Sequence, residues 1–113
     1  MVTAGTAAGL ASVSIGLAHP AQADAVAYLV NVTVRPGYNF ANAADALSYG
    51  NGICDKIGQS RSYAQIVAEV KSDFRTADDY QASYLITQAA NELCPAMIWQ
   101  LRNSAVHYQP SNP

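Results

Sequence analysis

The sequence predicts an all-α fold: a compact domain of four or five helices, closed by one disulfide. Three observations lead to this prediction. Beyond residue 23, apolar residues recur at the three- and four-residue spacing of amphipathic helices. Capping patterns and prolines divide the chain into short helical segments. Finally, the chain has two cysteines, Cys54 and Cys94, which suffice for one bridge.

Residues 1–23 have the composition of a signal peptide. They contain no Asp, Glu, Lys or Arg, and residues 6–18 are a run of small and apolar side chains. This run is shorter than the roughly 20 residues that span a bilayer, and small residues around Pro20 lead up to Ala23. We therefore expect export and cleavage after Ala23, although no Lys or Arg follows Met1. The alternative is a helix of small residues that packs into the fold.

The rest of the chain is expected to form one domain, residues 24–104, and a disordered tail, residues 105–113. The formal net charge of −2 provides no basic surface for nucleic acid. No segment after the leader is long and apolar enough to cross a membrane. We expect a protein that is secreted or held in the cell envelope, is not membrane-spanning and binds no nucleic acid.

The first helix is expected over residues 25–34. Asp24 is a suitable N-cap, and Pro36 follows shortly after the helix ends. The alternation of valines with polar residues over residues 30–34 leaves an extended conformation open at the C-terminal end.

The second helix is expected over residues 41–57, with Gly58 just beyond its end. It contains Gly50 and Gly52, and each glycine costs about 1 kcal/mol relative to Ala in a helix interior. We expect a neighbouring helix to approach closely at these glycines, one turn before Cys54. The alternative is a break in the helix.

Two capping patterns place the next two helices. Ser62 and Gln65 form an S-x-x-Q capping box in front of an apolar stripe. Thr76 and Asp79 form a weaker box of the same kind, and the helix that follows is expected to run to Cys94.

A short last helix is expected after Pro95, which suits the first position of a helix, and is expected to extend through Arg102. Trp99 in this helix is expected to fill the core rather than to anchor a partner.

A bridge between Cys54 and Cys94 follows from the expected export, because disulfides persist in oxidising compartments. Closing a loop of about 40 residues stabilises the fold by about 4 kcal/mol in the chain-entropy model. An intermolecular bridge and two free thiols are the alternatives. If the bridge forms, it joins the C-terminal ends of the second and fourth helices.

Taken in order, these features resemble a known family. Asp24 precedes the Tyr28-Leu29 pair, a Gly-Asn-Gly-Ile-Cys segment ends at Cys54, a Ser-led helix follows, and Cys94 is followed by proline. This order resembles DUF732, a mycobacterial family of small secreted proteins of unknown function, over about residues 24–102. Family members usually carry Gly-Ile near residue 35, where this chain has Arg-Pro-Gly. The resemblance implies an exported actinobacterial protein with one disulfide, and it implies no activity.

The residues that could carry catalysis are few. His107 is the only histidine after the leader, and it lies in the expected tail, which could not hold a catalytic geometry. Asp73, Asp78 and Asp79 are close in sequence, and helix capping accounts for them. We therefore expect no enzyme, no metal site and no cofactor.

Tyrosines are the remaining candidates, because the chain has seven against two phenylalanines. Tyrosine suits half-buried positions, where its ring is covered and its hydroxyl is wet. The functional interpretation is a groove formed by Tyr28, Tyr49, Tyr80 and Tyr84. We expect a non-enzymatic domain that acts by binding an unknown protein or a small apolar ligand. The alternative function is a carrier of haem or lipid, for which tyrosinate could be an iron ligand.

Overall fold

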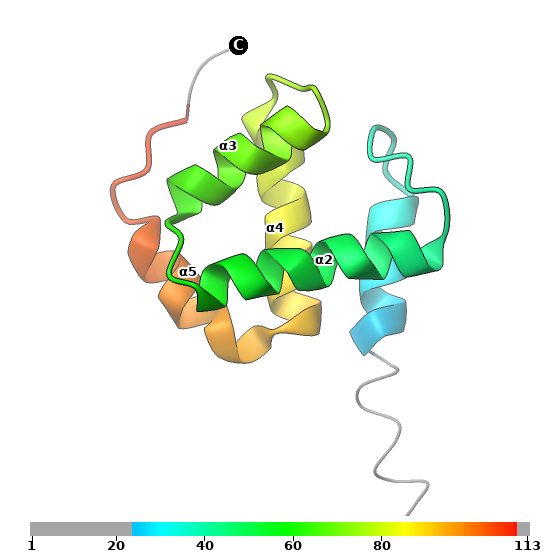
Figure 1. Ribbon diagram of the computed structural model, residues 1–113, viewed down its shortest axis with the longest axis horizontal. Coiled ribbons are helices and arrows are strands. Elements are labelled where there is room, and N and C mark those ends of the chain that lie inside the picture. The colour runs from blue at the N-terminus through cyan, green and yellow to red at the C-terminus, as the bar shows by residue number, and fades with distance from the viewer. Residues whose placement is uncertain (1–23, 111–113) are drawn as a thin grey trace, which may run out of the picture.

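The computed structural model of the protein describes residues 24–110, and all regular elements within that range are helices (Figure 1). Residues 24–33 form the N-terminal helix. The elements that follow are α2 (Ala43–Gly58), α3 (Tyr63–Asp73), α4 (Asp79–Leu93), the 3-10 turn η1 (Pro95–Met97) and α5 (Ile98–Ser104). The predicted all-α class is confirmed. The expected signal peptide, residues 1–23, lies outside the described residues.

The helix α4 forms the centre of the fold. It contacts α2, α3 and η1, and in Figure 1 α2 crosses in front of it. The N-terminal helix lies beside the first half of α2, and α5 lies near the other end of α2. α4 accordingly buries five residues, as many as α2: Ala82, Leu85, Ile86, Ala89 and Ala90.

The segment over residues 30–34, for which the sequence left two conformations open, is helical to residue 33. Tyr28 and Val32, one turn apart, are fully buried, and the Tyr28 hydroxyl donates a hydrogen bond of 2.9 Å to the Ala46 carbonyl. Helical geometry therefore turns Val30 and Val34 away from the core, and both are more than half exposed.

The capping box of α3 is present as predicted, with Ser62 and Gln65 satisfying each other's backbone N–H groups. The predicted box at Thr76 is wrong. The N-cap of α4 is Asp78, whose side chain accepts from the Tyr80 N–H, while the Thr76 hydroxyl accepts from the Asp78 N–H. Asp78 lies directly before the helix, and its carboxylate is a better N-cap than the hydroxyl of Thr76.

The glycines of α2 differ in their surroundings. A Cβ atom on Gly50 would lie 2.6 Å from Tyr28 Cζ and 2.7 Å from Leu93 Cδ1, whereas a Cβ atom on Gly52 would meet nothing within 4 Å. The expected close approach exists at Gly50 and not at Gly52. Gly58, which the sequence placed just beyond the helix, is the last residue of α2. The left-handed backbone conformation occurs two residues later, at Ser60.

The Cys54–Cys94 disulfide is confirmed, with a Cα–Cα distance of 6.1 Å. Cys54 lies in the last turn of α2, and Cys94 follows the last residue of α4. The bridge therefore joins the same two helix ends that the sequence predicts.

Two aromatic residues near the C-terminus depart from expectation. Trp99 does not fill the core: it is 71% exposed, and the Arg102 guanidinium lies 5.5 Å from its ring centroid. Tyr108 belongs to the segment expected to be a disordered tail. Its ring centroid lies 4.9 Å from that of Tyr63, and its hydroxyl donates a 2.8 Å hydrogen bond to Asp79.

Within residues 24–110, no helix combines the length and the apolar composition that crossing a membrane requires.

Candidate functional site

The four tyrosines singled out from the sequence do not form one groove. Tyr28 is fully buried beneath α2, and burial raises its pKa to about 12. Tyr49 belongs to an aromatic cluster with Phe40 and Phe74. Only Tyr80 and Tyr84 come together, one turn apart on α4, with ring centroids separated by 6.2 Å.

The aromatic cluster around Tyr49 contains Tyr38, Phe40 and Phe74. Its ring centroids lie between 5.1 and 6.2 Å from their neighbours. The Tyr49 hydroxyl donates a 2.7 Å hydrogen bond to Asp73. Burial, followed by this carboxylate, raises the pKa of Tyr49 well above its ordinary value. The cluster ties the connector before α2 to the end of α3, which is a structural role.

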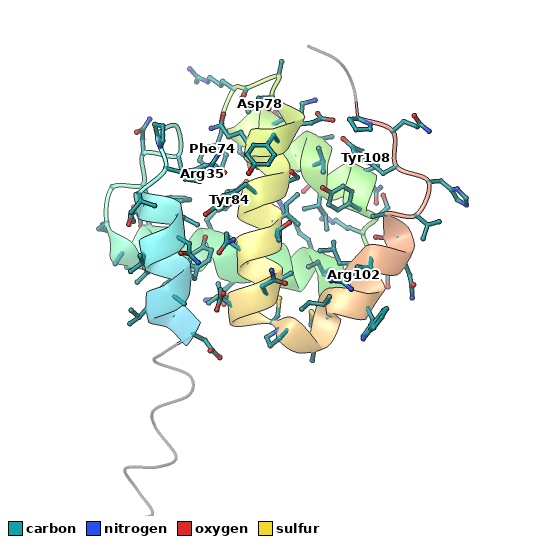
Figure 2. The ribbon with its side chains drawn as sticks, turned by 180° about the vertical axis from the view of Figure 1, so that it is seen from behind. Arg35, Phe74, Asp78, Tyr84, Arg102 and Tyr108 are labelled. Carbon is teal, nitrogen blue, oxygen red and sulfur yellow. A yellow bond between two sulfur atoms is a disulfide. The ribbon has the colours of Figure 1, made fainter. Side chains whose placement is uncertain are left out.

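A cation covers the tyrosine pair of α4. The Arg35 guanidinium lies 4.1 Å from the ring centroid of Tyr84 and 5.2 Å from that of Tyr80, and Figure 2 shows Arg35 beside Tyr84. The Tyr84 hydroxyl donates to the Asn31 carbonyl at 3.2 Å, which holds the ring in place. Arg35 takes part in none of the ion pairs found among residues 24–110, and its guanidinium also interacts with the Tyr38 side chain. A guanidinium in this position can donate further hydrogen bonds to an anion.

The outer face of the N-terminal helix is apolar. Val26, Val30 and Val34, which we call the valine ridge, are 58%, 53% and 72% exposed. They are four residues apart and therefore follow one side of the helix, opposite the buried Tyr28 and Val32. A helix of a soluble domain normally presents polar residues to water on that side. The valine ridge therefore marks a surface that another molecule can cover.

A surface groove of about 480 Å³ adjoins the valine ridge, and we call it the connector groove. Apolar side chains from the N-terminal helix and the connector alternate in its lining with polar ones. Its lining includes Leu29, Val32, Tyr38, Phe40, Arg35 and Asn39. Such a groove can hold a molecule with an apolar body and an anionic group.

The described residues include no group of three or more His, Cys, Asp or Glu side chains that could hold a metal ion. Both cysteines are bridged. His107 is exposed, beyond the end of α5.

Sequence reasoning missed Arg35 and the valine ridge. The pattern that reveals the ridge was present, because Val26, Val30 and Val34 follow the four-residue spacing of one helix side. The contact of Arg35 with Tyr84 joins residues that are far apart in the chain, and no local pattern announces it.

These features define a class: a small helical domain closed by one disulfide, with an apolar surface outside its core. The chain belongs to the family described as protein of unknown function (DUF732), whose family model matches residues 20–96. No curated protein and no solved structure matches the chain.

Proposed function

We propose that the domain is an exported, non-enzymatic module that acts by binding a partner protein through the valine ridge and Arg35. The exposure of the ridge is the observation that carries the proposal. Three large apolar side chains, each more than half exposed, line one side of a helix whose other side is already buried. Covering them with a partner removes apolar surface from water, which favours association.

The charge beside the ridge indicates the chemistry of the partner. Arg35 is held over Tyr84 and has no carboxylate of its own among the ion pairs of the described residues. A carboxylate on the partner can accept hydrogen bonds from this guanidinium in a fixed orientation. The proposed partner segment therefore has an apolar face flanked by an acidic residue.

Export is part of the proposal and is supported by composition. Residues 1–23 carry no Asp, Glu, Lys or Arg, and the one pair of cysteines is bridged, which suits an oxidising compartment. The resemblance to small secreted mycobacterial proteins supports the same assignment, with the mature chain either released or retained in the cell envelope.

The test places a photo-crosslinking residue at position 30 and, as the control, at exposed Gln59 near the far end of α2. A protein crosslinked at position 30 is then purified, and its affinity for the unmodified domain is measured. Val30→Asp is expected to weaken that affinity by about tenfold or more, because a charge on the ridge must be desolvated. Arg35→Gln is expected to weaken it less and to reduce its dependence on salt.

Two results overturn this function. One is equal crosslinking at positions 30 and 59. The other is an affinity that Val30→Asp leaves unchanged, because the partner then binds elsewhere.

A second candidate function is a lipid carrier, favoured by the connector groove. The groove offers about 480 Å³ beside apolar side chains and the Arg35 guanidinium, an arrangement suited to an acyl chain with an acidic head group. The structure favours haem less, because haem binding would need a tyrosine oxygen as the iron ligand. The hydroxyls of Tyr28, Tyr49 and Tyr84 are each hydrogen-bonded within the domain.

Titration with a fluorescent fatty acid tests the carrier function, with haem titration as the comparison. Saturable fatty-acid binding that weakens in Arg35→Gln supports a lipid carrier. A Soret shift on haem addition supports the haem alternative, and the absence of both signals rejects the carrier function.

A further inference from the structure

One side of α2 carries a coiled-coil spacing that packing within the chain covers only in part. Asp45, Tyr49, Gly52 and Lys56 are separated by four, three and four residues, as core positions of a coiled coil are. We call these four residues the α2 seam. Together with Phe40 and Ser48 they line a shallow surface hollow of about 390 Å³. The seam therefore has the pattern of a helix-packing surface. Tyr49 and Lys56 contact α3 through Asp73 and Glu69 at one flank of the seam, and the hollow between them is open to solvent.

Gly52 is the anomaly in this seam. A glycine inside a helix weakens it, and the other interior glycine, Gly50, is required because Tyr28 and Leu93 occupy the space of its missing side chain. Around Gly52 that space is empty, since a Cβ atom would meet nothing within 4 Å. Packing within the chain does not account for this glycine, whereas close approach by a second molecule does.

The charges of the seam are unbalanced at both ends. Lys56 and Arg61 both bind Glu69, each at 2.7 Å, so two cations share one carboxylate. At the other end, Asp45 joins none of the ion pairs found within residues 24–110. An acid is thus in excess at the start of the seam and a base at its end.

We propose that a second copy of this chain binds the α2 seam, with its α2 antiparallel to the first. A twofold axis between positions 50 and 51 brings Tyr49 of each copy to the partner's Gly52. The same axis brings Asp45 to the partner's Lys56. Both pairings follow from one axis position, which is what a self-complementary interface requires. The tyrosine ring covers the bare backbone at the glycine, and the charges at the two ends compensate each other.

This contact is small. The seam runs over twelve residues, Asp45 to Lys56, or about 16 Å of helix. A contact of this length buries less than the roughly 800 Å² per partner of a stable interface. We therefore expect a weak dimer whose population rises with concentration. The seam does not include the valine ridge, so this inference stands independently of the proposed function.

The first experiment measures self-association of the disulfide-bonded protein by sedimentation from about 10 μM to about 1 mM, a range suited to weak complexes. Gly52→Gln is expected to weaken the dimer at least tenfold, because its side chain separates the helices. The same change is expected to raise the melting temperature of the dilute monomer, because Gln favours a helix. The matched control is Asn51→Gln, which alters the next exposed residue of α2, outside the seam.

A second measurement tests the register with a carbodiimide, which joins a carboxylate to an amine in direct contact. Asp45 and Lys56 are eleven residues apart on one helix, about 16 Å, so an amide between them forms only between two copies. The expected product is a covalent dimer with this linkage that is lost in Gly52→Gln. The Lys56–Glu69 amide, between groups 2.7 Å apart in one copy, is the internal control.

A protein that stays monomeric to the highest concentration overturns the inference. So does a dimer that Gly52→Gln leaves intact, or one that Asn51→Gln weakens equally, because association then uses another surface.

Discussion

At the scale of single residues, Gly50 shows that a packed position can require a residue without a side chain. In the sequence Gly50 and Gly52 look alike, two helix-weakening residues separated by one residue. In the fold only Gly50 faces Tyr28, a large residue that is fully buried and hydrogen-bonded to Ala46. A side chain at position 50 would push this ring out of its place.

We therefore predict that Gly50→Ala destabilises the protein by about 1–3 kcal/mol, the usual cost of overpacking a core. Gly52→Ala is the matched control, and at low concentration it should stabilise the protein by about 0.5–1 kcal/mol. Urea unfolding of both variants provides the comparison. Equal effects of the two substitutions would contradict the close contact at Gly50.

The buried tyrosines link stability to alkaline pH. Burial raises the pKa of Tyr28 and of Tyr38 to about 12, from an ordinary value of about 10. An unfolded chain loses these protons first, so the folded state is stabilised fully below about pH 10 and less as the pH rises towards 12. Below about pH 10 the contribution of these two tyrosines to stability does not change with pH.

We predict that the free energy of unfolding falls between about pH 10 and pH 12. Tyr28→Phe, which has no ionisable group, should reduce the size of that fall. Urea unfolding at several alkaline pH values, followed by circular dichroism, measures both effects. A stability that is flat above pH 10 would show that these hydroxyls ionise as easily in the folded protein as in the unfolded chain.

At the scale of elements, capping decided where helices begin. The Ser62 capping box was predictable because it joins two residues three positions apart. The side chain of each residue, Ser62 and Gln65, accepts a hydrogen bond from the backbone N–H of the other. The start of α4 was not, because two candidate caps, Thr76 and Asp78, precede it. Asp78 accepts from the Tyr80 N–H, and Thr76 instead accepts from Asp78.

Asp78→Ala is therefore expected to cost about 1 kcal/mol of stability, within the usual 0.5–2 kcal/mol range for a lost N-cap. Thr76→Ala should cost less, because it removes a hydrogen bond outside the helix. The two variants are compared by urea unfolding at neutral pH. A larger loss for Thr76→Ala would favour the capping box that the sequence alone suggested.

At the scale of the whole molecule, the disulfide connects the ends of two helices that pack together. Cys54 and Cys94 are 40 residues apart, and the loop they close contains the whole of α3 and of α4. A domain of this size has a limited core, so the bridge supplies a large share of its net stability.

Replacing both cysteines by serine is predicted to lower the free energy of unfolding by about 4 kcal/mol, from the entropy of the opened loop. Thermal melting of this double variant and of the reduced wild-type protein should agree. A melting curve that does not change on reduction would contradict this role.

Sequence alone determined what depends on local spacing: the helical class, the α3 capping box, the short last helix after Pro95 and the pairing of two cysteines. These follow from periodicity, from caps and from the count of thiols, each readable within a few residues or from composition. The tertiary structure decided what depends on residues distant in the chain. It separated Gly50 from Gly52, placed Arg35 over Tyr84, exposed Trp99 and divided the four tyrosines between core and surface. The physical reason is that burial and contact belong to the packed helices together, whereas helix formation belongs to each segment.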